Sequence, residues 1–281
     1  MSEEVNKKRK STMQRIATAV PLVAALVLML CLGGWVLAVF IMACLSVALY
    51  EELNALKNGG YHPVWWPCFA ALVGSAPLMM NHSTTAFGSV MMVASLVILF
   101  CVMSRREPQL LDAVMSVVPL MTIVLPGMCM FGILDTQPRS FQLYLLFLLF
   151  VIPILGDTCA YFVGRAVGGP KLCPQISPNK TISGALGGLL GSMMGALLVG
   201  GAFALFARDH AFPPVWVNLL VGLVAGAASQ MGDLLASMIK RHCKIKDFGT
   251  IFPGHGGMMD RLDSILFSAI ILYCFRAIIG G

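Results

Sequence analysis

Two acidic side chains, Asp157 and Asp233, interrupt stretches of sequence that are otherwise apolar. Ser237, Lys240 and Arg241 follow Asp233 at i+4, i+7 and i+8, so a helix would place an acid, a hydroxyl and two bases on one face. An unpaired carboxylate at membrane depth costs at least about 3 kcal/mol, so we expect Asp233 to face a polar cavity and to meet a cation. A purely structural ion pair of Asp233 with Lys240 or Arg241 is the alternative.

Two more acids, Asp260 and Asp263, lie at i and i+3 in the first turn of the expected last helix. One of them could simply cap that helix, because acids are favoured at helix N-termini. Together with Asp233 they exceed what capping needs, and carboxylates from different helices form the oxygen-rich kind of site that holds Mg²⁺. No cysteine or pair of histidines accompanies them, which argues against zinc.

A glycine-rich turn, Pro253 to Gly257, precedes these acids. The backbone N–H groups of such a turn can point at phosphate, although proline and glycine also mark ordinary loops. The candidate substrate-binding and catalytic residues of this region are His255, Gly256 and Gly257 in the turn, with Lys246, Asp247 and Arg261 beside it.

A second polar segment lies upstream. Asp157, Tyr161 and Arg165 are spaced for one helical face, and the stretch Ser177-Pro178-Asn179-Lys180-Thr181 comes after them. There Ser177, Lys180 and Thr181 offer two hydroxyls and an ammonium group that could grip a polyphosphate. The alternative is an ordinary helix start with Thr181 or Ser183 as the cap. The P-loop pattern is absent.

The composition identifies an integral membrane protein. Of the 281 residues, 58% are hydrophobic and only 11% are charged, against about a quarter charged in soluble proteins. The net charge of +6 comes from short basic clusters between apolar runs, so lipid or nucleotide phosphates are expected anionic partners and nucleic acid is not. The nine cysteines are scattered without paired spacing and indicate buried thiols.

The apolar runs predict an all-α, polytopic fold with about nine membrane-spanning helices. Their expected positions are 16–32, 34–52, 64–80, 86–103, 110–132, 141–163, 182–206, 214–239 and 262–279. With a cytoplasmic N-terminus, all 19 Lys and Arg residues except Arg139, Arg208 and Arg276 fall on the cytoplasmic side, as membrane topology favours. The polar loops 165–181 and 240–261 then lie in the cytoplasm, and the C-terminus lies outside.

We expect one membrane domain made of N-terminal helices over 1–140 and a catalytic region over 141–281. The small-residue spacings Gly187, Gly191, Gly195 and Gly222, Gly226 predict close helix packing rather than catalysis. A long polar stretch that could form a separate soluble domain is missing.

The residues from Ser237 to Asp263 match the pattern S-x-x-K-R-x4-K-D-x-G-x3-P-G-H-G-G-x2-D-R-x-D at every fixed position. This pattern resembles the signature of the phosphatidate cytidylyltransferases, the CDP-diacylglycerol synthases. The resemblance extends to G-D-T-x-A-Y at 156–161, S-P-x-K-T at 177–181 and G-D-L at 232–234. It covers the C-terminal half strongly, whereas residues 1–140 resemble the family only in hydropathy and in R-I-x-T at 15–18.

The resemblance implies Mg²⁺-dependent transfer of the cytidylyl group from CTP to phosphatidate, giving CDP-diacylglycerol and pyrophosphate at a cytoplasmic-side active site. It implies that Asp233 and Asp260 bind metal, while Asp247 and Asp263 assist them or are further ligands and Asp157 orients a cation. The expected phosphate-binding residues are Lys240, Arg241, Lys246, Ser177, Lys180 and Thr181. The expected partners are CTP, phosphatidate, membrane lipid and a second copy of the chain in a homodimer, and the expected location is the cell (inner) membrane.

Two other functions remain open at this point. A CTP-using polyprenol or lipid kinase would move the γ-phosphate and would need a general base near a lipid hydroxyl. An ion-coupled transporter would also place acids inside the membrane, but it predicts an inverted repeat, and the charged motifs here lie only in the second half of the chain.

Overall fold

The computed structural model describes residues 28, 30, 32–80, 84–206, 212–252 and 256–279, and nearly all of them are helical. The helices before the catalytic region are α2 (Gly34–Asn58), α3 (Trp65–Met80), α4 (Thr84–Met103), α5 (Leu110–Pro119), the π-helix η1 (Leu120–Val124) and α6 (Leu125–Leu134). They are followed by α7 (Arg139–Val167), β1 (Lys171–Cys173), β2 (Ser177–Thr181), α8 (Ile182–Phe206), α9 (Val215–His242) and α10 (Met259–Ile279).

Among the described helices, six are long and apolar enough to cross a membrane, with α5, η1 and α6 acting as one continuous span, Leu110–Leu134. The other five are α2, α7, α8, α9 and α10. Helix α3 has 16 residues, and the apolar part of α4, Gly88–Met103, is also shorter. The first expected span, 16–32, falls almost entirely outside the described residues, so the count of nine stays a prediction.

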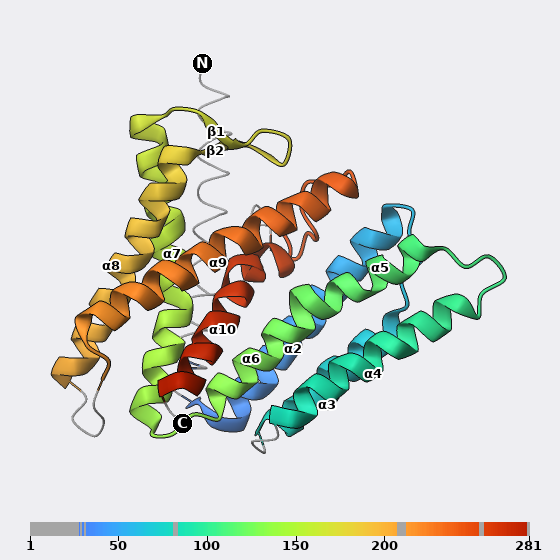
Figure 1. The fold of residues 1–281 in the computed structure, drawn as a ribbon, viewed down its shortest axis with the longest axis horizontal. Helices are drawn as coiled ribbons and strands as arrows, with labels where there is room; N and C mark the ends of the chain where they lie inside the picture. The colour runs from blue at the N-terminus through green and yellow to red at the C-terminus, as the bar shows by residue number, and fades with distance from the viewer. Residues whose placement is uncertain are drawn as a thin grey trace.

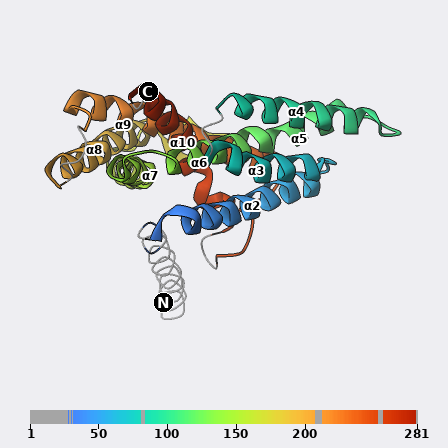
Figure 2. The ribbon, with the colours of Figure 1, turned by 90° about the horizontal axis from the view of Figure 1, so that it is seen from below.

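The helices form two groups around a central set (Figures 1 and 2). Helices α7, α8 and α9 pack on one side, α3 and α4 pair on the other, and α2, α6 and α10 lie between them. Helix α10 contacts α9, α6, α7 and α2, so the last helix joins the N-terminal and C-terminal halves. The core between the helices is mostly apolar. Among its few polar groups, Tyr144 on α7 donates its hydroxyl proton to Asn218 Oδ1 on α9 at 2.7 Å.

Glycines bring α7 and α8 close together. A Cβ at Gly187 would lie 2.5 Å from Val163, and one at Gly191 would lie 2.6 Å from Cys159 Cβ. In lipid, helices associate through van der Waals contact, which small residues permit at short range. A Cβ at Gly222 on α9 would likewise lie 2.8 Å from the backbone of Met193 on α8. The packing role predicted for these small residues is therefore confirmed.

The polar segment after α7 is a short hairpin, which the sequence did not predict. Strands β1 and β2 pair antiparallel, with Lys171 opposite Thr181. Gly168 and Gly169 have φ values of +66° and +106° and turn the chain out of α7, while Pro174 and Pro178 disfavour a helix between there and α8. The strand pairing of the hairpin fixes the backbone position of Lys180 near the end of β2.

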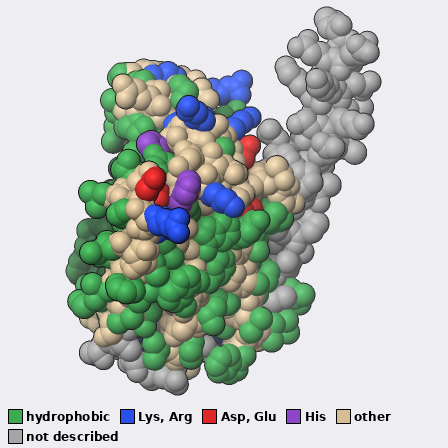
Figure 3. Space-filling model, turned by 90° about the vertical axis from the view of Figure 1, so that its right-hand side faces the viewer, with side chains coloured by type: hydrophobic (Ala, Val, Ile, Leu, Met, Phe, Trp, Pro, Cys, Tyr) green, Lys and Arg blue, Asp and Glu red, His purple; other side chains and the backbone are tan. Residues whose placement is uncertain are grey.

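Polar and apolar surfaces are segregated on the molecule. On the face drawn in Figure 3, charged and histidine side chains gather in the upper part, and a broad apolar surface lies below them. Such a division is typical of a membrane protein whose charged helix ends reach water.

Candidate functional site

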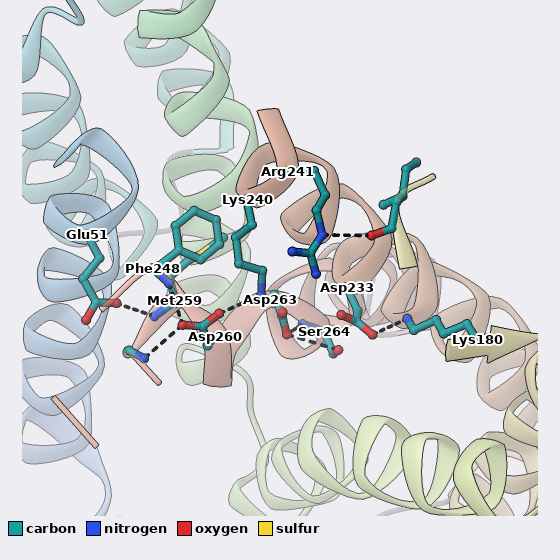
Figure 4. A network of polar contacts seen from close by, with 12 residues as sticks. Glu51, Lys180, Asp233, Lys240, Arg241, Phe248, Met259, Asp260, Asp263 and Ser264 are labelled. Atoms are coloured by element: carbon teal, nitrogen blue, oxygen red, sulfur yellow. Dashed lines mark hydrogen bonds and ion pairs between the residues drawn. The ribbon is translucent and has the colours of Figure 1, made fainter. Parts of the chain in front are cut away.

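Two acid–base pairs form the centre of the site (Figure 4). Lys180 on β2 pairs with Asp233 on α9, and their side chains are 31% and 27% exposed. Lys240, near the end of α9, pairs with Asp260 on α10 at 2.7 Å, with side chains only 12% and 4% exposed. The expectation that Asp233 meets a cation is confirmed. The alternative that this cation is Lys240 or Arg241 is wrong, because the hairpin brings Lys180 to Asp233 instead.

Asp260 also holds the start of α10 against the preceding loop. Its Oδ1 accepts from Lys240 Nζ, and its Oδ2 accepts from the backbone N–H groups of Phe248 at 2.8 Å and Gly257 at 2.9 Å. The ammonium group of Lys240 lies 5.3 Å from the centre of the Phe248 ring, within the range of a cation–π contact. A single carboxylate thus fixes Lys240, Phe248 and Gly257 relative to one another.

A close approach of α9 and α10 brings a second group of acids together. A Cβ at Gly232 would lie 2.4 Å from the carbonyl oxygen of Asp263, so only glycine lets α10 pass at this height. Asp263 is 8% exposed, and its Oδ1 accepts from the backbone N–H of Ser264 at 2.7 Å. The negative charges of Asp233 and Asp157 lie close enough to repel the negative charge of Asp263. Three helices therefore direct acids toward one region.

Cations surround this acidic group. The positive charges of Lys180 and Arg261 attract the carboxylate of Asp157, and that of Lys240 attracts the carboxylate of Asp263. Opposite charges in a partly buried site attract one another more strongly than in water, because the effective dielectric constant is lower. The arrangement can bind a ligand that carries several negative charges together with a metal cation.

The carboxylates differ in how well they suit Mg²⁺, which prefers oxygen ligands. Asp233 is partly exposed and bonded to one lysine, so it can accept a metal ion. Asp260 has N–H donors on both oxygens and would have to release some of them. In the part of the chain that the structure describes, no three acidic, histidine or cysteine side chains lie close enough to hold a metal alone. Mg²⁺ commonly completes its shell with water and substrate phosphate, so the donor chemistry fits it.

The hairpin and the end of α9 lie against each other. Arg241 Nε donates to the carbonyl oxygen of Ile176 at 3.3 Å, which leaves the rest of its guanidinium group exposed. Ser177 begins β2 and is partly buried. Thr181 is buried, and its hydroxyl accepts from Gly184 N–H at 3.1 Å. It caps α8, as the alternative for this segment expected, and its contact with phosphate stays a prediction.

The remaining predicted residues lie around the loop between α9 and α10. Lys246, Asp247 and Arg261 are exposed, and Ser237 is partly buried. Gly256 has φ +83°, and its carbonyl oxygen accepts from Phe252 N–H at 3.0 Å. His255 lies outside the described residues, so its predicted role is untested.

One residue that the sequence did not single out lies at this site. Glu51 on α2 is 4% exposed and accepts from the backbone N–H of Met259 at 2.9 Å. The adjacent Glu52 is 0% exposed and lies instead against the Thr122 hydroxyl on η1. Two adjacent acids at the end of an apolar run were the available signal, but the expected span ended at residue 52. Nearby, burial raises the pKa of the Cys243 thiol, and the charge of Glu52 adds to the effect, so a thiolate nucleophile is disfavoured there.

Most of the chain is similar in sequence to known proteins. The model of the Cytidylyltransferase family matches residues 13–279. The phosphatidate cytidylyltransferase of Staphylococcus epidermidis (strain ATCC 35984) is 32% identical over 264 residues, covering 90% of this chain and 95% of that protein. The enzyme of the same name from Staphylococcus aureus (strain COL) is 33% identical over 263 residues, covering 90% and 95%. The one from Brucella suis biovar 1 is 41% identical over 130 residues, covering 46% of each chain.

Proposed function

Because the chain belongs to the Cytidylyltransferase family, we propose that it transfers the cytidylyl group of CTP to phosphatidate, giving CDP-diacylglycerol and pyrophosphate. It is a multi-pass membrane nucleotidyltransferase of phospholipid biosynthesis. One observation in the structure carries the proposal: Lys180, Asp233, Lys240 and Asp260 come from three motifs that are separate in the sequence, and they form two acid–base pairs in one region (Figure 4). A site of this kind suits the joining of two polyanions.

The reaction replaces one phosphorus–oxygen bond by another. An oxygen of the phosphatidate phosphate forms a bond to the α-phosphorus of CTP, the bond from that phosphorus to the bridging β-oxygen breaks, and pyrophosphate leaves with the electron pair. The attacking phosphate is already an anion, so no serine or cysteine nucleophile is required. The barrier lies in bringing like charges together, which cations offset.

The basic residues supply that offset. Lys180 and Lys240 are held at the acids in the resting protein and can turn to phosphate when substrates bring their own negative charge. Arg241, Lys246 and Arg261 are exposed beside them and neutralise the outer phosphates. Ser177, Thr181, Ser237 and the N–H groups around Gly256 and Gly257 are the proposed hydrogen-bond donors to the nucleotide and lipid phosphates.

The acids would hold Mg²⁺, which when bound offsets phosphate charge and orients the leaving group. Asp233 is the proposed principal ligand, with Asp157 and Asp263 beside it. Asp260 and Asp247 remain predicted contributors. In the resting protein Asp260 accepts from Lys240, so its role as a ligand requires Lys240 to move to phosphate.

The membrane arrangement is set by the position of the site. The diacyl chains of phosphatidate stay in the bilayer, and CTP arrives from the water that reaches the ends of α9 and β2. The distribution of Lys and Arg supports a cytoplasmic site and a location in the cell (inner) membrane. A homodimer remains a prediction that light scattering of the purified protein would test.

Two labels test the reaction. Purified protein is incubated with phosphatidate, Mg²⁺ and CTP labelled at either the α- or the γ-phosphate, and the lipids are extracted. We expect α-label in the lipid and γ-label in pyrophosphate. Label from the γ-position in the lipid would indicate a kinase instead. Absence of labelled lipid, under conditions where a known phosphatidate cytidylyltransferase works, would contradict the proposal.

A further inference from the structure

Glu51 connects the N-terminal half of the chain to the glycine-rich stretch at the start of α10. It lies on α2, is 4% exposed, and its Oε2 accepts from Met259 N–H at 2.9 Å across 208 positions of sequence. Figure 4 shows Glu51 reaching toward Met259 next to Asp260.

Among the described residues, Glu51 supplies the side-chain acceptor for the first N–H group of α10. The first N–H groups of a helix need acceptors from elsewhere, and the residue before α10 is Met258, whose thioether is a weak acceptor. Asp260 accepts from the N–H of Gly257, and Glu51 accepts from that of Met259. A carboxylate here is also favoured by the helix dipole. Glu51 therefore caps α10 from a different helix.

Two glycines of the motif are packed directly on Glu51. A Cβ at Gly249 would lie 2.1 Å from Glu51 Oε1, and one at Gly257 would lie 2.4 Å from Oε2. Residues from the two sides of the turn thus close on one carboxylate. A side chain at either position would displace the Glu51 carboxylate.

The position of Glu51 is not explained by stability alone. Its Oε1 is buried and has no hydrogen-bond partner among the described residues. A buried oxygen without a donor costs about 1–3 kcal/mol, and such departures concentrate where geometry serves function. The neighbouring Glu52 shows the contrast, since both of its oxygens lie within hydrogen-bond distance of the one Thr122 hydroxyl, at 2.9 and 2.8 Å.

We propose that Glu51 is a positioning residue for CTP: it holds Gly249 and Gly257, in the loop between α9 and α10, so that the adjoining N–H groups and Lys240 meet the triphosphate. This inference rests on the proposed function for the chemistry of the ligand. The nucleotide is the substrate affected because the turn adjoins exposed Lys246 and Arg261, whereas the lipid approaches through the bilayer.

The test compares Glu51→Ala, Glu51→Gln and the matched control Glu52→Gln in full-length purified protein. We expect Glu51→Ala to raise the KM for CTP about tenfold or more and to leave the KM for phosphatidate within about twofold. The amide oxygen of Glu51→Gln can still accept from Met259 N–H, so most of the CTP affinity should return. Glu52→Gln should lower the thermal midpoint without changing the KM for CTP. An unchanged KM in Glu51→Ala, or an equal rise in Glu52→Gln, would overturn the inference.

A second measurement tests the inference even if the Glu51→Ala protein does not fold or has no activity. Gly249→Ala is backbone-compatible, because Gly249 is not among the glycines with positive φ, and its methyl group would clash with Glu51. CTP binding is followed by thermal shift with Mg²⁺ present, which needs no turnover and separates this inference from the proposed reaction. We expect Gly249→Ala to weaken binding and the double variant with Glu51→Ala to bind no worse than Glu51→Ala alone. Additive losses would show that the two residues do not act through one contact.

Discussion

The two acids expected to bind metal, Asp233 and Asp260, are each paired with a lysine in the resting protein. Asp233 pairs with Lys180 and Asp260 with Lys240, which lowers the cost of holding charges near the membrane. When Mg²⁺ and nucleotide enter together, we expect the carboxylates to turn to the metal and the lysines to the phosphates. The number of ionic contacts is then conserved, so substrate binding does not leave a buried charge without a partner.

Asp233→Asn tests the metal role. The amide keeps the shape of the side chain but removes its charge, so we expect the Mg²⁺ concentration for half-maximal activity to rise about tenfold and kcat to fall about a hundredfold. Activity is measured over a titration of Mg²⁺. The control is Glu107→Gln, an exposed acid between α4 and α5, which should behave as wild type. An unchanged Mg²⁺ titration would remove Asp233 from the metal site.

Asp260→Asn tests the second pair. An amide places an N–H₂ group against either Lys240 or the N–H groups of Phe248 and Gly257, which are all donors. We expect product formation to fall by about a hundredfold or more, while the protein still elutes as a folded species on gel filtration. Turnover near the wild-type rate would show that neither metal binding nor the position of Lys240 depends on this carboxylate.

At the scale of helices, hydropathy predicted most of the architecture. The expected span 182–206 coincides with α8, and 214–239 lies within about three residues of α9, Val215–His242. The hairpin was missed because strands of three and five residues in a polar segment leave no periodic signal.

The contacts within the site were harder to predict than the helices. Helical spacing can relate Asp233 to Lys240, but the actual partner is Lys180, 53 positions away. Glu51 and Met259 are 208 positions apart. Only tertiary packing brings such pairs together, so motif residues could be named from the sequence while their partners could not.

Glycine packing between α7 and α8 gives a matched test on one helix. Alanine normally stabilises a helix by about 1 kcal/mol relative to glycine. At Gly191 the new Cβ would lie 2.6 Å from Cys159 Cβ and from the Leu155 carbonyl oxygen, whereas at Gly201 it would meet nothing within 4 Å. We expect Gly191→Ala to destabilise the protein by about 1–3 kcal/mol and Gly201→Ala to be neutral or stabilising, measured as thermal midpoints in detergent. Equal midpoints would show that the α7–α8 contact is not limiting.

At the scale of the whole molecule, the polar groups of the site gather at helix ends, which the distribution of Lys and Arg predicts to be cytoplasmic. The hairpin, the end of α9 and the start of α10 meet there. Water-soluble CTP and a bilayer-bound lipid can approach such a site from different sides. Orientation is therefore part of the mechanism.

Cysteine labelling tests that orientation. Single cysteines are introduced at Asp247, in the α9–α10 loop, and at Ala277, near the end of α10, in a variant without native cysteines. Both positions are exposed. In intact cells we expect a membrane-impermeant maleimide to label Ala277→Cys, and to label Asp247→Cys only after permeabilisation. The opposite pattern would place the site on the outer side.

The link between α2 and α10 also affects when the enzyme can first work. Glu51 is synthesised 208 residues before Met259, which at cellular elongation rates is a delay of about 10–40 s. Until α10 enters the membrane, the Glu51 carboxylate lacks its backbone partner Met259. Completion of the nucleotide site is thus tied to insertion of α10, so a nascent chain should gain the ability to use CTP only after α10 has been synthesised.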